Sequence, residues 1–332
     1  MGNVSRSDPH PMLKAGFIGA GDRAFLVHLP ILRRLKDVEM AAVCEINPER
    51  LKRATEAYSF GSVYEDHLEM LEREELDIVY CVMHEQYLLQ PALSVLRAGI
   101  HLFVEKPPGM NAGETRRLHD TAVEHDVFAA VCFQRRYSAV VQEAKRRLDE
   151  KGPVTLATAT FNKQVLGKKS QEIPSTLWHD ACHAVDLMRY MAGGTRTEVS
   201  VRRDTFGSQS RNFYMALVGF DNRATGCVFA NRASGGRVFR AELHGVGLGC
   251  YLDLPETIEI YDDNEHEVLN GWELAGVAKE DTAEYDGHSA MHRHIIECAL
   301  NGTTPITDLR DVVHTMRLVD MIEGQSGPGG EE

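Results

Sequence analysis

Several features that would assign this chain to a specialised class are missing from its sequence. The seven cysteines are dispersed, most of them in apolar runs, and none forms a Cys-x-x-Cys pair. That usage is typical of reduced thiols in a reducing compartment. No hydrophobic run reaches membrane-spanning length, and the polar residues 1–11 contain no signal-peptide core. We therefore expect a soluble, cytoplasmic protein that has no membrane partner.

Positive charge is also scarce relative to negative charge. The chain has 36 Lys and Arg residues against 49 Asp and Glu residues, a net charge of −13, and no basic cluster. This balance argues against nucleic acid or an anionic membrane as a partner. With 332 residues, 43% of them hydrophobic, the chain is long enough for two domains with a sizeable core. The sequence shows no internal repeat.

A glycine-rich turn lies between the first apolar run and the first helical pattern. Gly19, Gly21 and Ala24 have the spacing G-x-G-x-x-A. The first glycine permits a tight turn, the second lets the backbone approach a pyrophosphate, and the alanine allows close helix–strand packing. An ordinary strand-to-helix turn can carry the same glycines, but this position favours a dinucleotide-binding βαβ unit. Asp22 and Arg23 lie in the turn and belong to the predicted cofactor site.

A carboxylate follows the next apolar run, at the place where such a unit binds the adenine ribose. The side chain of Glu45 is suited to the ribose diol, whereas it would repel a 2′-phosphate. We therefore expect NAD rather than NADP, although Arg50, Lys52 and Arg53 on the following helix favour NADP. A solvated strand end is the simpler interpretation of Glu45 taken alone.

Apolar runs alternate with amphipathic helical patterns as far as about residue 135. The alternation predicts a doubly wound parallel sheet, a Rossmann domain over residues 13–135. Pro30 lies inside the first helical pattern and should bend it or leave a carbonyl unpaired. The predicted strands are Lys14–Gly19, Met40–Cys44, Ile78–Met83, His101–Glu105 and Phe128–Phe133, and the helices lie near Phe25–Leu35, Pro48–Tyr58, Leu88–Ala98 and Ala112–His125.

The pattern then changes to strands in succession, which predicts a second α/β domain over 136–323 with a large open, mostly antiparallel sheet. Residues 221–222 and 234–236 are predicted to be loops between antiparallel neighbours. The predicted strands are Val154–Asn162, Glu198–Asp204, Asn212–Phe220, Thr225–Ala230, Val238–His244 and Gly249–Leu254, and the helices are Ala139–Glu150, His183–Met191, Ser289–Leu300 and Leu309–Ile322. We expect residues 1–12 and 324–332 to be disordered.

Glu105 and Lys106 directly follow the fourth predicted strand. The ligand crevice of an open α/β sheet lies at the carboxyl ends of its strands, so Lys106 is placed where a nicotinamide and a substrate would meet. A lysine there can donate to a substrate oxygen and lower the pKa of the hydroxyl group. The alternative is a surface lysine before a proline turn.

Two histidines and a carboxylate form the second concentration of ionisable groups. On a helix, His179 and His183 are four residues apart and Asp180 is three from His183, so the three could share one face. Histidine suits the exchange of a hydroxyl proton. The pair could also bind zinc or be purely structural. We predict no metal, because the nearest third ligands, His292 and His294, point to different sides of a helix.

Taken together, these segments resemble the glucose–fructose oxidoreductase / inositol dehydrogenase (Gfo/Idh/MocA) family. The resemblance covers nearly the whole chain and implies a Rossmann domain followed by an α/β domain with a large open sheet. It also implies assembly through that sheet into a homodimer or homotetramer, and NAD(P)-dependent chemistry at a carbinol carbon. The matching segments are Gly19–Gly21, Val43–Arg50, Ala98–Pro107, Phe133–Tyr137, Cys182–Tyr190 and Pro305–Asp311.

The resemblance implies roles for particular residues. Lys106 matches the lysine that assists proton transfer, and His183 matches the usual acid/base. The family often has an aspartate four residues before that histidine. His179 occupies this position here, so either Asp180 orients His183 or His179 changes the polarity of the pocket.

A second departure concerns the cofactor. The family's Thr-Pro beside it is replaced by Met83 and His84, and its usual following histidine falls at Leu88. Met83, His84 and Glu105 therefore complete the predicted cofactor site.

Our sequence-based hypothesis is an NAD-dependent dehydrogenase or ketoreductase acting on a sugar, cyclitol or related polyol. The alternatives are a nucleotide-sensing or scaffold protein without turnover and a metal-dependent hydrolase. The residues predicted to line the substrate side are Arg135, Arg136, Tyr137, Lys163 and Trp178.

Overall fold

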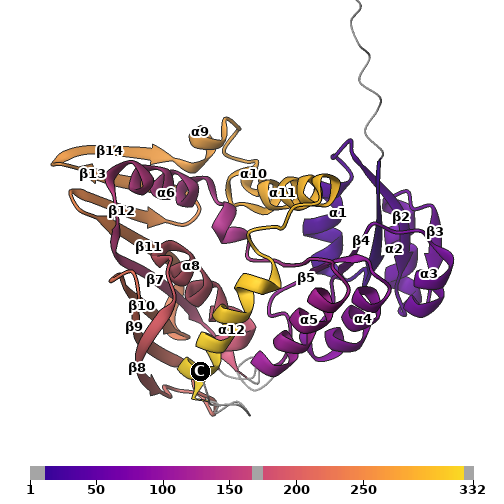
Figure 1. The fold of residues 1–332 in the computed structure, drawn as a ribbon, viewed down its shortest axis with the longest axis horizontal. Helices are drawn as coiled ribbons and strands as arrows, with labels where there is room; N and C mark the ends of the chain where they lie inside the picture. Colours follow the sequence, from indigo (N-terminus) through magenta and orange to yellow (C-terminus); the bar gives the residue numbers. More distant parts are fainter. Residues whose placement is uncertain (1–11, 167–174, 325–332) are drawn as a thin grey trace, which may run out of the picture.

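Two sheets of different pattern organise residues 12–166 and 175–324, which the computed structural model describes (Figure 1). The first sheet has six parallel strands in the order β3-β2-β1-β4-β5-β6. The doubly wound parallel sheet predicted from the sequence is confirmed. Its strands are β1 (Leu13–Ile18), β2 (Val38–Cys44), β3 (Ser62–Tyr64), β4 (Ile78–Cys81), β5 (His101–Val104) and β6 (Ala129–Val131).

Helices connect these strands, and Figure 1 shows them on both sides of the sheet. Two elements were missing from the prediction, namely the three-residue strand β3 and the helix α3, which follows it. The helices of this half are α2 (Pro48–Ala57), α3 (His67–Arg73), α4 (Glu85–Arg97) and α5 (Ala112–Glu124).

The first helix is interrupted, as Pro30 led us to expect. A π-helical turn, η1 (Ala24–His28), precedes α1 (Leu29–Leu32), and the N–H of Leu29 bonds to the carbonyl of Ala24, five residues back. Proline cannot donate a backbone hydrogen bond, so it is tolerated only at the start of a regular helix. The wide turn leaves the side chain of His28 fully buried.

The second sheet has eight strands in the order β14-β13-β12-β11-β7-β10-β9-β8. Only β7 and β10 pair in parallel, so the expected open, mostly antiparallel sheet is confirmed. Its strands are β7 (Val154–Gln164), β8 (Arg196–Asp204), β9 (Phe213–Phe220), β10 (Thr225–Asn231), β11 (Ala233–Gly245), β12 (Leu248–Asp253), β13 (Thr257–Asp262) and β14 (Glu265–Asn270).

The two loops predicted in this sheet have different outcomes. Residues 221–222 connect the antiparallel neighbours β9 and β10, as expected. Residues 234–236 are not a loop: they lie inside β11, where the pairing with β7 shifts register between Ala233 and Val238. The glycines therefore accommodate a bulge rather than a hairpin turn.

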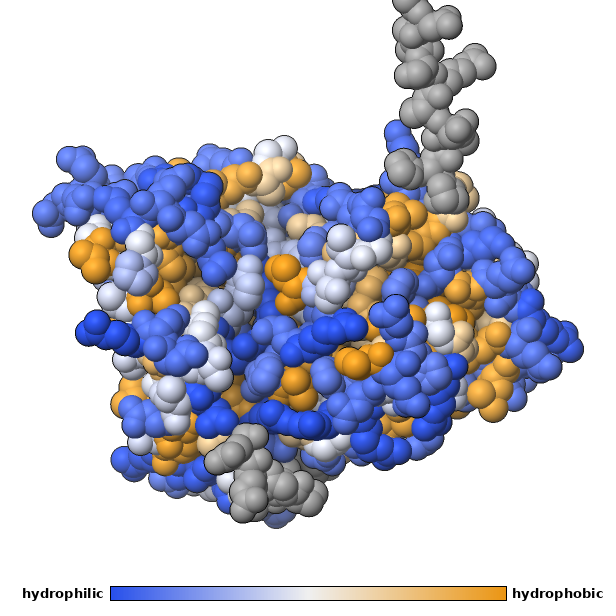
Figure 2. All heavy atoms as spheres, in the orientation of Figure 1, coloured by the Kyte–Doolittle hydropathy of each residue, from blue (hydrophilic) through white to orange (hydrophobic). Residues whose placement is uncertain are grey.

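Helices cover one face of the second sheet, where α6 and α8 pack against β7, β10, β11 and β12. The other face exposes a row of apolar side chains. Figure 2 shows that on the viewed face polar side chains separate the apolar ones into small groups. The remaining helical elements are η2 (Gln134–Tyr137), α6 (Ala139–Lys151), η3 (Leu177–Ala181), α8 (Cys182–Ala192), α9 (Gly271–Ala275), α10 (Thr282–Tyr285), α11 (His288–Asn301) and α12 (Leu309–Glu323).

The chain returns to the first sheet near its end. α12 packs against α5 and α8, and α11 packs against α1 and β1 (Figure 1). No helix of the described residues is long and apolar enough to cross a membrane. The residues predicted to be disordered, apart from Met12 and Gly324, lie outside the described residues.

Candidate functional site

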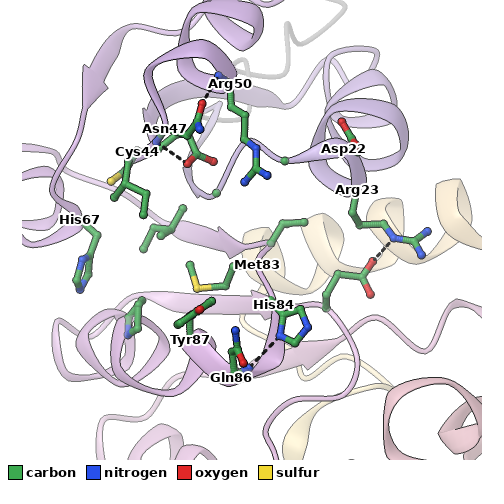
Figure 3. A pocket seen from close by; sticks show the side chains of 18 of the residues that line it. Asp22, Arg23, Cys44, Asn47, Arg50, His67, Met83, His84, Gln86 and Tyr87 are labelled. Carbon is green, nitrogen blue, oxygen red and sulfur yellow. Dashed lines mark hydrogen bonds and ion pairs between the residues drawn. The ribbon is translucent and has the colours of Figure 1, made fainter. Parts of the chain in front are cut away.

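A cleft of about 810 Å³ lies at the carboxyl ends of β1, β2, β4 and β5 (Figure 3). This is the edge at which open parallel sheets bind ligands. Its lining contains nearly all of the predicted cofactor residues: Gly19, Gly21, Asp22, Arg23, Glu45, Met83, His84, Glu105 and Lys106.

The glycine turn has the geometry that a pyrophosphate site requires. Gly19 has φ +95°, and a Cβ there would lie 2.4 Å from the carbonyl oxygen of Val82, so only glycine fits. A Cβ at Gly21 would meet nothing within 4 Å, which leaves this backbone open to the cleft. Ala24 is fully buried in the core beneath the turn. This agrees with its place as the third small residue of the G-x-G-x-x-A pattern, where helix and strand pack closely.

Glu45 lies at the end of β2 with its carboxylate turned to the glycine turn. One oxygen accepts the N–H of Ala20 at 2.8 Å, and the other accepts the N–H of Asn47 at 2.9 Å. Each carboxylate oxygen has a second lone pair, so the group can still accept from a diol in the cleft. The contacts fix the negative charge of Glu45 at the base of the turn.

Two of the three basic residues that favoured NADP have other partners. Arg53 pairs with Asp22 at 2.9 Å and lies over the ring of Phe25, and Lys52 pairs with a glutamate on its own helix. The guanidinium of Arg50 points into the cleft (Figure 3) and makes no side-chain hydrogen bond to a described residue.

The end of β4 brings an unpredicted carboxylate into the cleft region. His84 caps α4 by accepting the N–H of Gln86. The next residue, Glu85, binds the Nδ1 of His179 at 2.7 Å. This contact holds the side chain of His179 at the cleft wall. Sequence patterns gave no signal for Glu85, because its partner is 94 residues away.

Lys106 reaches across the cleft from β5. Its side-chain Nζ donates to the backbone carbonyl of His179 at 2.6 Å, and its backbone N–H donates to the carboxylate of Glu105 at 3.0 Å. Arg23 lies 3.5 Å from the same carboxylate. Burial alone would raise the pKa of Glu105, but the His28 hydrogen bond and the charges of Lys106 and Arg23 hold that pKa well below its usual range.

His183, the second residue of α8, is partly buried beside this wall. Its ring lies edge-on to Phe133, and its Nδ1 has no hydrogen-bond partner among the described residues. Burial is the main reason that the pKa of His183 is well below its usual value, and the positive charges of Lys106 and Arg135 lower that pKa further. The imidazole is therefore neutral near pH 7 and can accept a proton.

Asp180 does not orient His183, which corrects one of our sequence-based interpretations. Its carboxylate pairs with Lys163 at 3.0 Å and with Arg232 at 3.4 Å. Burial opposes ionisation, but the charges of Arg232, Lys106 and Lys163 lower the pKa of Asp180 to about 2. The cause is η3, a π-helical turn that changes the predicted spacing, so the ionisable side chains do not share one face.

Arg232 was missed, since no motif surrounds it. The residue follows β10, is almost completely buried, and donates from Nη1 to the carbonyl of Phe161. Its Nε and Nη2 make no hydrogen bond within the described part of the chain.

Three of the predicted substrate residues are instead structural. Arg136 is buried and binds Asp186 and Asp311, Tyr137 is buried beside Thr307, and Trp178 is in the hydrophobic core. Arg136 and Tyr137 lie on the 3₁₀ turn η2 and Trp178 lies on the π-helical turn η3, and all three side chains are buried. Arg135 differs: its Nη1 has no hydrogen-bond partner among the described residues, and its charge acts on His183.

The histidines considered for zinc are not gathered together. Among the described residues, the group of potential metal ligands that lies close together is His28, Glu105 and Cys132. Neither His179 nor His183 belongs to it.

Comparisons with known proteins agree with this geometry. Residues 13–133 match the GFO_IDH_MocA family model, an oxidoreductase family with an NAD-binding Rossmann fold. The chain is 27% identical to scyllo-inositol 2-dehydrogenase (NAD(+)) of Bacillus subtilis (strain 168) over 74% of each protein. It is 29% identical to D-glucoside 3-dehydrogenase of Escherichia coli (strain K12), over 41% of this chain but only 39% of that enzyme.

The fold as a whole also has a solved counterpart. The crystal structure of a dehydrogenase from Chromobacterium violaceum superposes with a TM-score of 0.85 over 94% of both chains, at 20% sequence identity. At that identity the similarity concerns the fold, which includes both sheets.

Proposed function

We propose that this chain is a member of the Gfo/Idh/MocA family of oxidoreductases, whose NAD-binding Rossmann model its residues 13–133 match, and that it is an NAD-dependent dehydrogenase or ketoreductase of a polyhydroxylated substrate. The observation that carries the proposal is that Lys106 lines the cleft and lies close enough to His183 for its charge to help lower the pKa of that imidazole. The two relatives reported above are named for a cyclitol and a glucoside, which supports a sugar, cyclitol or related polyol as substrate.

The cleft residues fit the cofactor. The open backbone at Gly21 would hold the pyrophosphate, and the carboxylate of Glu45 would accept from the adenine ribose. Met83 and His84 line the other half of the cleft, where the nicotinamide would lie. When bound, NAD supplies the hydride acceptor for oxidation of a carbinol carbon. Because Glu45 repels a 2′-phosphate, we expect the preference to be for NAD.

Proton transfer falls to His183. A neutral imidazole has one unprotonated ring nitrogen, so a substrate hydroxyl could donate to it and lose its proton there. The ammonium of Lys106 would donate to the same oxygen and favour its deprotonation. Its present acceptor is a neutral backbone carbonyl, which a substrate oxygen can replace.

Asp180, Lys163 and Arg232 form a polar group suited to several hydroxyls. The carboxylate can accept from a substrate hydroxyl, and the unsatisfied guanidinium N–H groups of Arg232 can donate to another. Arg135 supplies a further buried donor. A substrate rich in hydroxyl groups would satisfy these buried polar atoms, whereas an apolar alcohol would leave them unpaired.

The test combines cofactor titration with a substrate screen. NADH binding is measured by calorimetry, and a panel of sugars and cyclitols is screened through the absorbance of reduced nicotinamide. Lys106→Ala and His183→Ala should each lower kcat by about a hundred- to ten-thousand-fold while cofactor affinity changes little. Lys151→Ala, in an exposed ion pair, is the control. Cofactor binding without turnover on any polyol would favour the nucleotide-sensing alternative.

The proposal extends to assembly through the open face of the eight-stranded sheet. The register places six exposed apolar side chains on this face: Met215, Leu217, Val238, Tyr251, Tyr261 and Val268. A row of this kind on a monomer is a candidate interface. Light scattering should give a dimer or tetramer, which Leu217→Glu should weaken. A monomeric wild-type protein would contradict this part of the proposal.

A further inference from the structure

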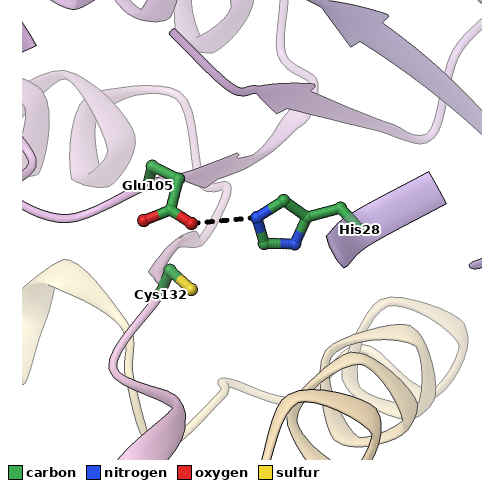
Figure 4. A group of neighbouring side chains, drawn as sticks. All are labelled: His28, Glu105 and Cys132. Atoms are coloured by element: carbon green, nitrogen blue, oxygen red, sulfur yellow. Dashed lines mark hydrogen bonds and ion pairs between the residues drawn. The ribbon is translucent and has the colours of Figure 1, made fainter. Parts of the chain in front are cut away.

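A buried row of three hydrogen-bonded side chains ends at Glu105, the residue before Lys106, and the proton transfer proposed above does not use it. His28 comes from the first helical turn, Glu105 from the end of β5, and His292 from α11 (Figure 4 shows the first two). His28 Nε2 lies 2.9 Å from the carboxylate of Glu105, and His28 Nδ1 lies 2.9 Å from His292 Nε2. Both histidines are completely buried.

The direction of these hydrogen bonds follows from the chemistry of the groups. The ionised carboxylate of Glu105 only accepts, so His28 Nε2 must donate to it. Burial lowers the pKa of both histidines, so each imidazole is neutral and has one N–H. The Nδ1 of His28 is then an acceptor and takes the N–H of His292 Nε2. Donation therefore runs from His292 through His28 to Glu105.

The groups around these three side chains stabilise the ionised carboxylate of Glu105 and disfavour the binding of a metal ion. Besides the hydrogen bond from His28, the positive charges of Lys106 and Arg23 act on the carboxylate of Glu105. Cys132 completes a set of metal-ligand types with His28 and Glu105, but burial raises the pKa of its thiol well above normal. Two nearby cations and a protonated thiol oppose a bound metal.

The position of Glu105 determines which half of a bound dinucleotide its negative charge would lie near. The residue lines the cleft at the end of β5. The strand order β3-β2-β1-β4-β5-β6 puts β2 and Glu45 on one side of the glycine turn and β5 on the other. The adenine half of a dinucleotide lies toward β2, so the nicotinamide half lies toward Glu105.

We propose that the His292–His28–Glu105 chain fixes a negative charge beside the nicotinamide half of the cleft and so favours the oxidised, positively charged cofactor over the reduced one. The inference rests on the proposed function, because it requires NAD in this cleft. Glu105 acts on the ring by charge, and the two histidines are positioning residues that act through Glu105. The charge of the oxidised ring disappears on reduction, so the carboxylate discriminates between the two forms.

The quantity to measure is the ratio of the Kd of NADH to the Kd of NAD⁺, obtained by calorimetry or fluorescence without any substrate. Glu105→Gln keeps the size of the side chain but removes the charge, and the ratio should fall about tenfold. For a two-electron couple, tenfold corresponds to about 30 mV in the potential of the bound cofactor. His292→Leu removes the first donor and should give a smaller fall. His292→Gln retains an N–H at the same reach and should restore the ratio.

Glu65→Gln is the matched control, since it removes the same charge from the lining of the cleft beyond β3, on the adenine side. There the two affinities should change together and leave the ratio constant. An unchanged ratio in Glu105→Gln would overturn the inference while leaving the proposed function intact. Absence of binding by either form in the wild type would overturn the proposed function itself. Stoichiometric zinc, removed by Cys132→Ser, would show a metal site instead and also overturn the inference.

Discussion

The placement of Arg136 in a buried ion network leads to a sharp prediction about stability. Its guanidinium makes two hydrogen bonds to Asp186, at 2.8 and 2.5 Å, one to Asp311 at 2.6 Å and one to the carbonyl of Ile306 at 2.7 Å. Burial alone would lower the pKa of Arg136, but the two carboxylates raise it. Arg136→Met would leave Asp186 almost completely buried, with the hydroxyl of Thr315 as its remaining side-chain partner.

A buried charge left in this way costs about 3–5 kcal/mol of folding free energy. The assay is urea unfolding, with NADH affinity measured in parallel. The double variant Arg136→Met with Asp186→Leu should recover much of the loss, because it removes both charges. Arg73→Leu breaks an exposed pair on α3 and should cost about 0.3–0.5 kcal/mol. If Arg136→Met changed stability by less than about 1 kcal/mol and instead raised the KM of the substrate, Arg136 would belong to the substrate site after all.

Four further substitutions test the cleft and the residues beside it. Gly19→Ala should destabilise the protein, because its Cβ would clash with the Val82 carbonyl, whereas Gly21→Ala should leave the melting temperature unchanged and weaken NADH binding. Glu45→Ser should reduce the ratio of NAD to NADP affinity in calorimetry, and an unchanged ratio would remove the carboxylate from the ribose. In Asp180→Asn, the free energy of unfolding should fall less steeply between about pH 4 and pH 2 than it does in the wild type. Because the folded pKa of Asp180 is about 2 against an ordinary 3.8, its contribution is present above about pH 4 and is lost as the pH falls toward 2; an unaltered acid transition would contradict the ion pairs.

Local patterns predicted the parallel sheet well, because each buried strand is a short apolar run followed by a helical period. They failed where an element is short or polar. β3 has only three residues, and none of them is fully buried. The strands β13 and β14 were also missed. Their hairpin turns at Asp263 and Asn264, which both have positive φ, and most side chains of β14 are polar, so no apolar run marks that strand.

The cofactor half of the cleft could be predicted for a physical reason that the substrate half lacks. A glycine turn and the acid after the next strand belong to one local unit with fixed geometry. The residues around His183 instead depend on a π-helical turn, which a helical wheel does not anticipate. They depend also on distant partners: Glu85 for His179, and Arg232 for Asp180. Sequence spacing did not show which of these side chains face one another, and three of the five residues predicted to line the substrate side are instead buried structural residues.

The same reasoning explains why the end of the chain matters to a cleft built near its beginning. His292 lies 264 residues after His28, and Asp311 lies 175 residues after Arg136. The first contact is buried and the second is partly buried, and both join the C-terminal helices to earlier segments of the chain. Because a buried polar group without its partner is costly, these contacts fix the position of α11 and α12 against the first sheet. They thereby also help to hold the end of β5 and the start of α8, which carry Lys106 and His183, close to one another.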